Sequence, residues 1–504
     1  MAAIPISRAM AILAQRAPDE PIMIDGARVI TRAAFDRNTN RLARALAGLG
    51  VGHGDFVSIL LPNSVQFLET VVAAWKLGAV PQPLSRGLAP REAAEILALV
   101  RPRVIVGHAG CSAPGALSVP EGFVPDAALS DDAMPDIIAP HFKAMASGGS
   151  TGRPKVIVAG NPGTIDLDAP CPTVQPLERI LVTGPLHHNA PFFATATSLL
   201  SGGCAVLMSR FDPEQVLAMI DRHRINFVTL VPTMMLRIWR LGPAVRAKYN
   251  LRSLRSVVHS ASPCPVWLKE SWIEWLGADR IVEAYSSTEA PGYTIIGGRE
   301  WLAKKGSVGK ADPAACEVMI ADSDGRAVPS GTVGEVFMRP ATGPDATYFF
   351  GDRYRYIGAE PRRLAAGWDS MGDLGYLDGD GYLFLCDRST DLIIRGGANI
   401  YPAEVEAAIE SHPMVRSCVV IGLPDEDLGE TVAAVIETTE AMNGEEMRSY
   451  LKTRLSGHKI PAAMEFVDRP MRDTAGKVRR REVRDAWLTR RPADGACAVS
   501  APAA

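Results

Sequence analysis

The chain has 504 residues, which is too many for one ordinary core, so two to four domains or subdomains are expected. Hydrophobic residues make up 47% of the chain and charged residues 22%, which is typical of a globular protein and excludes a disordered or fibrous one. A formal net charge of −3 gives no overall electrostatic reason to bind nucleic acid or an anionic membrane, so neither is expected as a partner.

The cellular compartment is predicted from three features that the sequence does not show. No run of eighteen apolar residues is present, and the apolar stretch at 9–13 is too short for the core of a secretory leader. The eight cysteines are scattered, with no C-x-x-C pair and no spacing typical of zinc. We therefore expect a cytoplasmic protein with reduced thiols and no integral membrane segment.

Strand-like and helix-like segments alternate over the first half of the chain. The strands are expected at 55–61, 80–84, 103–106, 179–183, 205–208 and 226–231. The helices are expected at 64–77, 90–99 and 191–200, and a further one opens at Asp212-Pro213. This alternation predicts an α/β fold with mainly parallel sheets. Its two similar sets of elements predict a large N-terminal domain with two βα-layered subdomains.

From residue 308 onward the sequence pattern changes. Short apolar strands with Gly and Asp turns at 308–385 predict a small β subdomain within the N-terminal domain, 1–389. A small α+β C-terminal domain is expected at 390–491, with helices at 403–411 and 444–455 and strands at 415–421 and 431–436. The Ala-rich tail, 492–504, is expected to be disordered. The arginines of the basic run at 477–481 are expected to be the solvated start of a terminal helix.

The glycine-rich segment 146–160, ASGGSTGRPKVIVAG, has two functional interpretations. Gly148 to Gly152 fits the G-x-S-x-G nucleophile elbow of a serine hydrolase, with Ser150 as nucleophile. The same residues with Lys155 fit a phosphate cradle of backbone N–H groups, hydroxyls and an ammonium group. An elbow needs a helix after its serine, whereas Pro154 and three β-branched residues follow here. The prediction is strand, loop, strand, and a surface turn without a ligand stays open as a third interpretation.

Four further clusters carry polar groups that could bind a nucleotide. Tyr-Ser-Ser-Thr-Glu289 follows a strand, where open α/β sheets bind ligands, and its carboxylate is a candidate Mg²⁺ ligand. Asp373 lies between glycines, where it could accept hydrogen bonds from a ribose. Asp387-Arg388 precedes a Gly-Gly loop, and Lys477 lies on a glycine turn near the C-terminus. Each cluster alone is equally consistent with a solvated turn or a surface charge.

In their order and spacing these clusters resemble the adenylate-forming (AMP-binding) superfamily, in its acyl-CoA synthetase or acid–CoA ligase branch. The motifs that carry the resemblance are Ser-Gly-Gly-Ser-Thr-Gly-Arg-Pro-Lys155, Ser-Ser-Thr-Glu289, Gly-Asp373, Asp-Arg388, Gly-Gly-Ala-Asn-Ile-Tyr-Pro-Ala-Glu-Val-Glu406 and Thr-Ala-Gly-Lys477. The resemblance extends over residues 5–485.

The resemblance implies a two-step reaction with ATP, Mg²⁺ and coenzyme A. A carboxylic acid first attacks the α-phosphate to give acyl-AMP and pyrophosphate, and a thiol then displaces AMP. A fatty, bile-acid or steroid-like, or aryl acid is expected as the substrate, which would place the enzyme in fatty acid or lipid metabolism. The small C-terminal domain is expected to be mobile, since in this family it rotates between the two steps.

The resemblance also implies roles for individual residues. The nucleotide is expected to contact Ser147, Gly148, Gly149, Ser150, Thr151, Gly152, Lys155, Ser260, Ala261, Ser262, Ala284, Tyr285, Ser286, Ser287, Thr288, Asp373, Arg388 and Lys477. The catalytic residues are expected to be Lys477, Glu289, Thr151 and His188, with Glu289 as the metal ligand. The acyl pocket is assigned to His188, Asn189, Thr233 and Ser286, the CoA site to Arg395, Gly396 and Gly397, and the hinge to Thr390.

Three departures from the family pattern and several alternatives remain. Val156 and Thr390 replace commoner residues, and Ser286 stands where glycine is usual, which adds bulk and a hydroxyl beside the acyl group. The nearest alternative is an enzyme that loads a carrier protein instead of CoA. A serine hydrolase using Ser150 and a nucleotide-binding module without catalysis belong to other functional classes. A homodimer is left open as an assembly.

Overall fold

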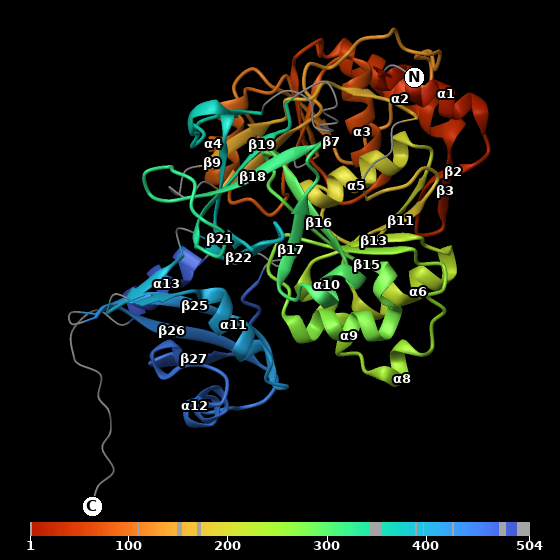
Figure 1. Ribbon diagram of the computed structural model, residues 1–504. Helices are drawn as coiled ribbons and strands as arrows, with labels where there is room; N and C mark the ends of the chain where they lie inside the picture. Colours follow the sequence, from red (N-terminus) through yellow and green to blue (C-terminus); the bar gives the residue numbers. More distant parts are fainter. Residues whose placement is uncertain are drawn as a thin grey trace, which may run out of the picture.

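The computed structural model describes residues 3–107, 110–148, 154–168, 173–342, 354–388, 391–396, 398–425, 428–472 and 480–490. They form a large N-terminal body and a smaller C-terminal domain, drawn in blue in Figure 1 beside β21 (Asp369–Leu377) and β22 (Leu383–Arg388). Within these ranges, no helix is long and apolar enough to span a bilayer.

The first subdomain is a parallel four-stranded sheet in the order β5-β4-β6-β7. The side chain of Ser64 starts its first helix by accepting a hydrogen bond from the Phe67 N–H at 3.2 Å. The second helix begins with Pro90 and ends at Arg101 in the left-handed region, with φ 52°. These elements are β4 (Phe56–Leu60), α3 (Val65–Lys76), β5 (Val80–Pro83), α4 (Pro90–Val100), β6 (Val104–Gly107) and β7 (Leu117–Pro120).

A three-stranded antiparallel sheet, β20-β9-β8, contacts this subdomain through α4 and β5. Its strands are β8 (Ala144–Gly148), β9 (Pro154–Val158) and β20 (Arg355–Ile357). The two strands predicted on either side of the loop are therefore confirmed, with Lys155 opposite Ser147 near the start of the second strand. The loop between the strands lies outside the described residues.

The second subdomain is a parallel sheet in the order β15-β14-β13-β11-β12-β2, and β3 adds an antiparallel edge. The predicted strands at 179–183, 205–208 and 226–231 are confirmed within it. Its strands are β2 (Pro21–Asp25), β3 (Arg28–Thr31), β11 (Arg179–Val182), β12 (Cys204–Leu207), β13 (Phe227–Leu230), β14 (Ser256–His259) and β15 (Ile281–Ser286).

Helices surround this second sheet, and Figure 1 shows α6, α9 and α10 below it. The α6 N-terminus is capped by Asp212, which accepts a hydrogen bond from the Gln215 N–H at 2.8 Å. The helices and minor elements are β1 (Ile4–Pro5), α1 (Ile6–Arg16), α2 (Arg32–Gly48), β10 (Thr164–Ile165), α5 (Asn189–Leu200), α6 (Pro213–His223), α7 (Pro232–Trp239), α8 (Pro243–Arg246), α9 (Val266–Leu276) and α10 (Gly298–Ala303).

The short strands at 307–388 extend the same sheet. Antiparallel β16 (Tyr293–Gly297) pairs with β15 and with β17 (Ser307–Ala311), and β17 pairs with β22. The strands β18 (Cys316–Ala321) and β19 (Gly334–Pro340) complete the region, giving thirteen strands in one order. The region nevertheless has its own small core, made of Val308, Ile320, Val336, Met338, Met371 and Leu383. The predicted β subdomain is thus a second core on a continuous sheet.

The C-terminal domain is a separate five-stranded sheet with two covered faces. Helices α11 (Pro402–Glu410) and α12 (Gly444–Lys452) supply residues to one core, and α13 (Arg480–Arg490) supplies Trp487 to the other. The strands are β23 (Ile393–Arg395), β24 (Ala398–Ile400), β25 (Val415–Asp425), β26 (Gly429–Thr438) and β27 (Ala463–Val467). The domain boundary predicted at 389/390 lies outside the described residues and stays a prediction.

Candidate active site

The candidate active site is a cleft of about 2810 Å³ between the two domains. Most of the described residues assigned to the site from the sequence line this one cleft. They are Ser147, Lys155, His188, Asn189, Thr233, Ser260, Ala261, Ser262, Ala284, Tyr285, Ser286, Ser287, Thr288, Glu289 and Asp373. A cleft of this size exceeds the usual volume of a single small-molecule site, so it has room for more than one substrate.

The carboxyl ends of β14 and β15 bring two predicted segments together at the cleft. The Ser260–Ser262 segment follows β14, and Ala261 within it has a left-handed backbone with φ 76°. Such a conformation is unfavourable for alanine, and strain of this kind clusters at ligand sites. The neighbouring strand β15 ends at Ser286, immediately before the Ser287–Glu289 segment. Adjacent parallel strands therefore deliver hydroxyls and a carboxylate to one sheet edge.

A three-residue contact lies in the part of the cleft beside β8, β9 and β20. The Lys155 Nζ atom lies 3.1 Å from Glu289 Oε1 and 2.8 Å from the hydroxyl of Tyr356. The Tyr356 hydroxyl in turn donates to Glu289 Oε1 at 2.6 Å. The hairpin β8–β9 provides Lys155, and β20 provides Tyr356. The segment that follows β15 provides Glu289. Lys155 was predicted to bind phosphate and Glu289 to bind metal, and the structure places the two side by side.

The electrostatics of Glu289 suit a metal ligand. Burial alone would raise the pKa of this carboxyl, but the Lys155 charge and the hydrogen bonds from Tyr356 and Lys155 outweigh burial and lower it. Glu289 is therefore ionised at neutral pH. Among the described residues no cluster of three His, Cys, Asp or Glu side chains could hold a metal alone. One carboxylate fits Mg²⁺ that arrives with a nucleotide, since such an ion takes its other ligands from phosphates and water.

The predicted ribose residues meet on a β-ladder. Asp373 on β21 pairs in register with Arg388 at the end of β22, whose side chain lies outside the described residues. The Tyr285 hydroxyl donates to Asp373 Oδ2 at 2.6 Å. This bond orients the aspartate and connects it to the Tyr285–Glu289 segment. Asp373 thus lies at the cleft, where its carboxylate can accept hydrogen bonds from a diol.

The part of the cleft that was predicted to hold the acyl group, its acyl side, begins at the N-terminus of α5. His188 precedes the helix, and its ring centroid lies 4.4 Å from that of His187. Asn189 is the first helical residue, and its side-chain oxygen accepts a hydrogen bond from Lys143. Burial lowers the pKa of Lys143 from 10.5 to about 7. Thr233, on α7, also lines this side of the cleft.

Ser286 lies at the cleft, as predicted. Its hydroxyl was expected beside the acyl group, but it is bonded to a backbone carbonyl instead. Ser286 Oγ donates to the Gly292 carbonyl at 2.7 Å. This bond closes the turn between β15 and β16. The serine therefore adds bulk to the cleft, while the hydroxyl is turned toward the backbone of the same loop.

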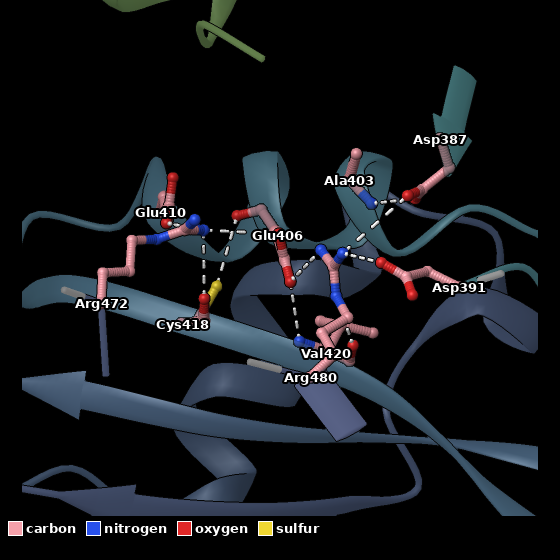
Figure 2. Close-up of polar contacts among 9 residues, drawn as sticks. All are labelled: Asp387, Asp391, Ala403, Glu406, Glu410, Cys418, Val420, Arg472 and Arg480. Atoms are coloured by element: carbon pink, nitrogen blue, oxygen red, sulfur yellow. Dashed lines mark hydrogen bonds and ion pairs between the residues drawn. The ribbon is translucent and has the colours of Figure 1, made fainter. Parts of the chain in front are cut away.

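Arg480 at the domain junction contradicts the predicted solvated arginines. Figure 2 shows its guanidinium between Glu406 and Asp391, each bonded at 2.7 Å, and Asp387 lies 4.0 Å away. Burial alone would lower the pKa of Arg480, but Glu406 and the two aspartates raise it. The prediction for Arg480 was wrong because acidic groups from three distant segments surround it. Arg481 is 70% exposed and fits the solvated expectation.

A second contact joins the domains at the same place. The Ala403 N–H at the start of α11 donates to Asp387 Oδ2 at 2.8 Å, and Asp387 immediately precedes Arg388. Arg472 bonds to Glu406 and Glu410 on the same helix, as Figure 2 also shows. Arg480 lies three residues after Lys477, which is outside the described residues, so this network fixes the chain just beyond that lysine.

Several predicted residues lie elsewhere or outside the described residues. Of the proposed CoA site, Arg395 donates to the His458 carbonyl at 2.7 Å and Gly396 to the Leu428 carbonyl at 2.7 Å, both within the C-terminal domain and off the described lining of the cleft. The residues Gly149, Ser150, Thr151, Gly152, Thr390, Gly397 and Lys477 lie outside the description, and for Gly148 only the backbone is described.

Sequence comparison identifies the family of this chain. A model of AMP-binding enzymes matches residues 11–343, and a model of the AMP-binding enzyme C-terminal domain matches residues 404–477. A feruloyl-CoA synthase of an Amycolatopsis species is 35% identical over 488 residues, covering 94% of this chain and 96% of that enzyme. A long-chain fatty acid–CoA ligase of Mycobacterium tuberculosis is 29% identical over 488 residues, covering 91% and 93%.

Comparison with solved structures also identifies CoA synthetases as similar proteins. The o-succinylbenzoate CoA synthetase of Bacillus subtilis, in complex with its acyl-adenylate intermediate, superposes with a TM-score of 0.81. The sequences are 26% identical, and the superposition covers 96% of this chain and 99% of that one. The similarity therefore includes both domains and the cleft between them.

Proposed function

Because this chain belongs to the family of AMP-binding enzymes, we propose that it activates an aryl or extended apolar carboxylic acid as acyl-AMP and passes the acyl group to coenzyme A. The protein is an acid–thiol ligase of the AMP-forming acyl-CoA synthetase class. The observation that carries the substrate proposal is that one cleft joins the Lys155–Glu289 pair to a long, mainly apolar acyl side.

In the first step a carboxylate oxygen attacks the α-phosphate, and the bond to pyrophosphate breaks. Lys155 and the N–H groups of its loop would neutralise phosphate charge, and Asp373 would hold the ribose. Glu289 would hold Mg²⁺, which when bound neutralises charge on the phosphates. The contacts of Thr151 and Lys477 with phosphate and carboxylate remain proposals from the family resemblance.

The apolar lining of the acyl side supports an apolar substrate. Val231, beyond the carboxyl end of β13, lines the cleft, and so does Pro191 of α5. Phe193 and Ala194 of α5 line the cleft too. The feruloyl-CoA synthase relative favours the aryl acid within this class.

In the second step a thiolate attacks the acyl carbonyl, and AMP leaves with its phosphate oxygen. We propose coenzyme A as the thiol, with Arg395, Gly396 and Gly397 nearby once the C-terminal domain has turned about Thr390. A carrier protein is the second candidate acceptor, since its phosphopantetheine arm ends in the same thiol. A serine hydrolase is disfavoured because β9, a strand, follows the Ser150 loop where an elbow requires a helix.

The test is pyrophosphate release from MgATP with a panel of acids, from short acids through substituted cinnamic acids to long-chain and steroid acids. Each acid is assayed with CoA, with a phosphopantetheine-bearing carrier protein and without a thiol, and the products are identified by mass. We expect turnover with an aryl or extended apolar acid and CoA, and its loss in Lys477→Ala. Preference for the carrier protein would establish the second candidate acceptor.

A further inference from the structure

Tyr356 lies in a position that none of the predicted roles accounts for. It is the middle residue of β20 and faces Ile157 of β9, two residues from Lys155. Its hydroxyl contacts both Lys155 Nζ, at 2.8 Å, and Glu289 Oε1, at 2.6 Å. Because an ammonium group can only donate, the hydroxyl accepts from Lys155 and directs its own proton to Glu289. The phenol is thus a polar bridge that lines the cleft.

The second tyrosine of this region directs its hydroxyl to a different carboxylate. Tyr354 is 6% exposed, and its hydroxyl donates to the buried Asp369 at 3.1 Å. Arg363 also bonds to Asp369, so this carboxylate has a charged partner of its own. The rings of Tyr354 and Tyr356 lie 5.1 Å apart, yet only Tyr356 is among the described residues that line the cleft.

We propose that Tyr356 is a positioning residue that holds the Glu289 carboxylate in the orientation that receives the metal of MgATP. The proposal rests on the proposed function, in which Lys155 turns to the phosphates when the nucleotide binds. Glu289 then loses its cationic partner, and the Tyr356 hydroxyl remains as its donor. Both contacts use Oε1, so the hydroxyl fixes one oxygen of the carboxylate and thereby the direction of the other. Partners of this kind are commonly needed to orient metal-binding carboxylates.

The test measures nucleotide binding, so it does not depend on turnover. The dissociation constant for ATP is measured by calorimetry with Mg²⁺ and again with EDTA, for the wild type, Tyr356→Phe and Tyr354→Phe. Tyr356→Phe keeps the ring that packs against Lys155, whose Nζ lies 3.9 Å from the ring centroid. We expect Tyr356→Phe to weaken MgATP binding about 10-fold. We expect the affinity of Tyr356→Phe for metal-free ATP to stay at the wild-type value. In Tyr354→Phe, the affinities for MgATP and for metal-free ATP should both stay at the wild-type value.

A double-mutant cycle then asks whether the hydroxyl acts through Glu289. In a Glu289→Gln background, Tyr356→Phe is expected to cause no further loss of MgATP affinity. Equal losses with and without Mg²⁺, an unchanged MgATP affinity, or the same loss in Tyr354→Phe would each overturn the proposal. Failure of the wild type to bind MgATP at all would instead overturn the proposed function, and this inference with it.

Discussion

The Lys155 ammonium lies 3.1 Å from the Glu289 carboxylate, although 134 positions separate the two residues in the chain. The hairpin β8–β9 brings Lys155 to the cleft, and the segment that follows β15 brings Glu289 there. The pair keeps Glu289 ionised in spite of its burial, because the Lys155 charge and the Tyr356 hydroxyl together outweigh desolvation. The cation that we propose for phosphate and the carboxylate that we propose for a divalent metal thus lie together.

Removing this cation should raise the pKa of Glu289. In the wild type that pKa lies below the ordinary value of 4.5, so the carboxylate is ionised above that pH. In Lys155→Met burial is no longer opposed by the lysine charge, so protonation sets in at higher pH. We expect the acid limb of MgATP affinity to move upward in pH, in addition to an overall loss of affinity. Binding measured from pH 4.5 to 7 checks this, and an affinity that falls no more toward acid pH in the variant than in the wild type would contradict it. Lys155→Arg, which keeps the charge, is the control.

Lys143 should lower the stability of the fold at neutral pH. Burial lowers its pKa from 10.5 in the unfolded chain to about 7, so at pH 7 and below the folded state bears the cost of a buried charge. Between these two values the unfolded chain binds the proton that the folded chain has released, so this cost falls as pH rises. We expect Lys143→Met to raise the free energy of unfolding on the order of 3 kcal/mol at pH 7, and by less at pH 10. Urea titrations at the two pH values measure the difference.

Lys76 provides the matched control for a buried lysine. Its Nζ lies 2.6 Å from Asp36 Oδ1 and also contacts Thr39 and Asn40. Lys76→Met would leave the Asp36 charge without its partner, so we expect a loss of about 3 kcal/mol. If Lys143→Met destabilised the protein as much as Lys76→Met at both pH values, the account of Lys143 would be wrong.

The Arg480 network should hold the C-terminal domain together at the junction. Arg480 is 20% exposed and bonds to Glu406, which is 8% exposed, so Arg480→Leu removes the nearer cation of that carboxylate and leaves only Arg472, at 3.4 Å. We expect a loss of about 3 kcal/mol in the unfolding free energy of this domain. Its tryptophan, Trp487, gives a fluorescence signal to follow. Arg481→Leu, at a 70% exposed position, should change stability by less than about 0.5 kcal/mol. Similar losses in both variants would contradict a specific role for Arg480.

Ser286 should limit the size of the acyl group. Its side chain lines the cleft, and its hydroxyl is turned to the Gly292 carbonyl at 2.7 Å. Ser286→Gly removes this bulk beside the acyl side, so the ratio of kcat/KM for a bulkier acid over a smaller one should rise about 10-fold. Steady-state kinetics with two acids that differ in one ring substituent give this ratio. An unchanged ratio would show that the acyl group does not reach Ser286.

The parts of the fold that the sequence predicts well are those with strong local signals. The helix that opens at Asp212 and Pro213 was predicted from an N-cap followed by a proline, and the structure confirms both. The strand, loop, strand arrangement around Lys155 was predicted from Pro154 and the β-branched run after it. What could not be predicted is the joining of the β subdomain to the parallel sheet, because the β17–β22 pairing depends on contacts between distant segments.

The same limit applies to the site. Glu289, Asp373 and Lys155 have motifs around them, whereas Tyr356 is one aromatic residue 201 positions from Lys155 and carries no local signal. Lys143 directly precedes β8, and the sequence around it carries no sign of burial. Its burial depends on how α5 packs beside it. Arg480 belongs to a basic run that favours solvent, and only the folded chain reveals its acidic partners. Residues that act through long-range contacts were therefore missed or misjudged.

The measurement that most directly tests the central claim is exchange of labelled pyrophosphate into ATP. Acyl-AMP formation predicts exchange that requires Mg²⁺ and a suitable aryl or extended apolar acid, proceeds without coenzyme A, and is greatly reduced in Glu289→Gln. Acid-independent cleavage of ATP to ADP, or hydrolysis of an aryl ester with no need for ATP, would contradict the account and favour a different chemistry in this cleft.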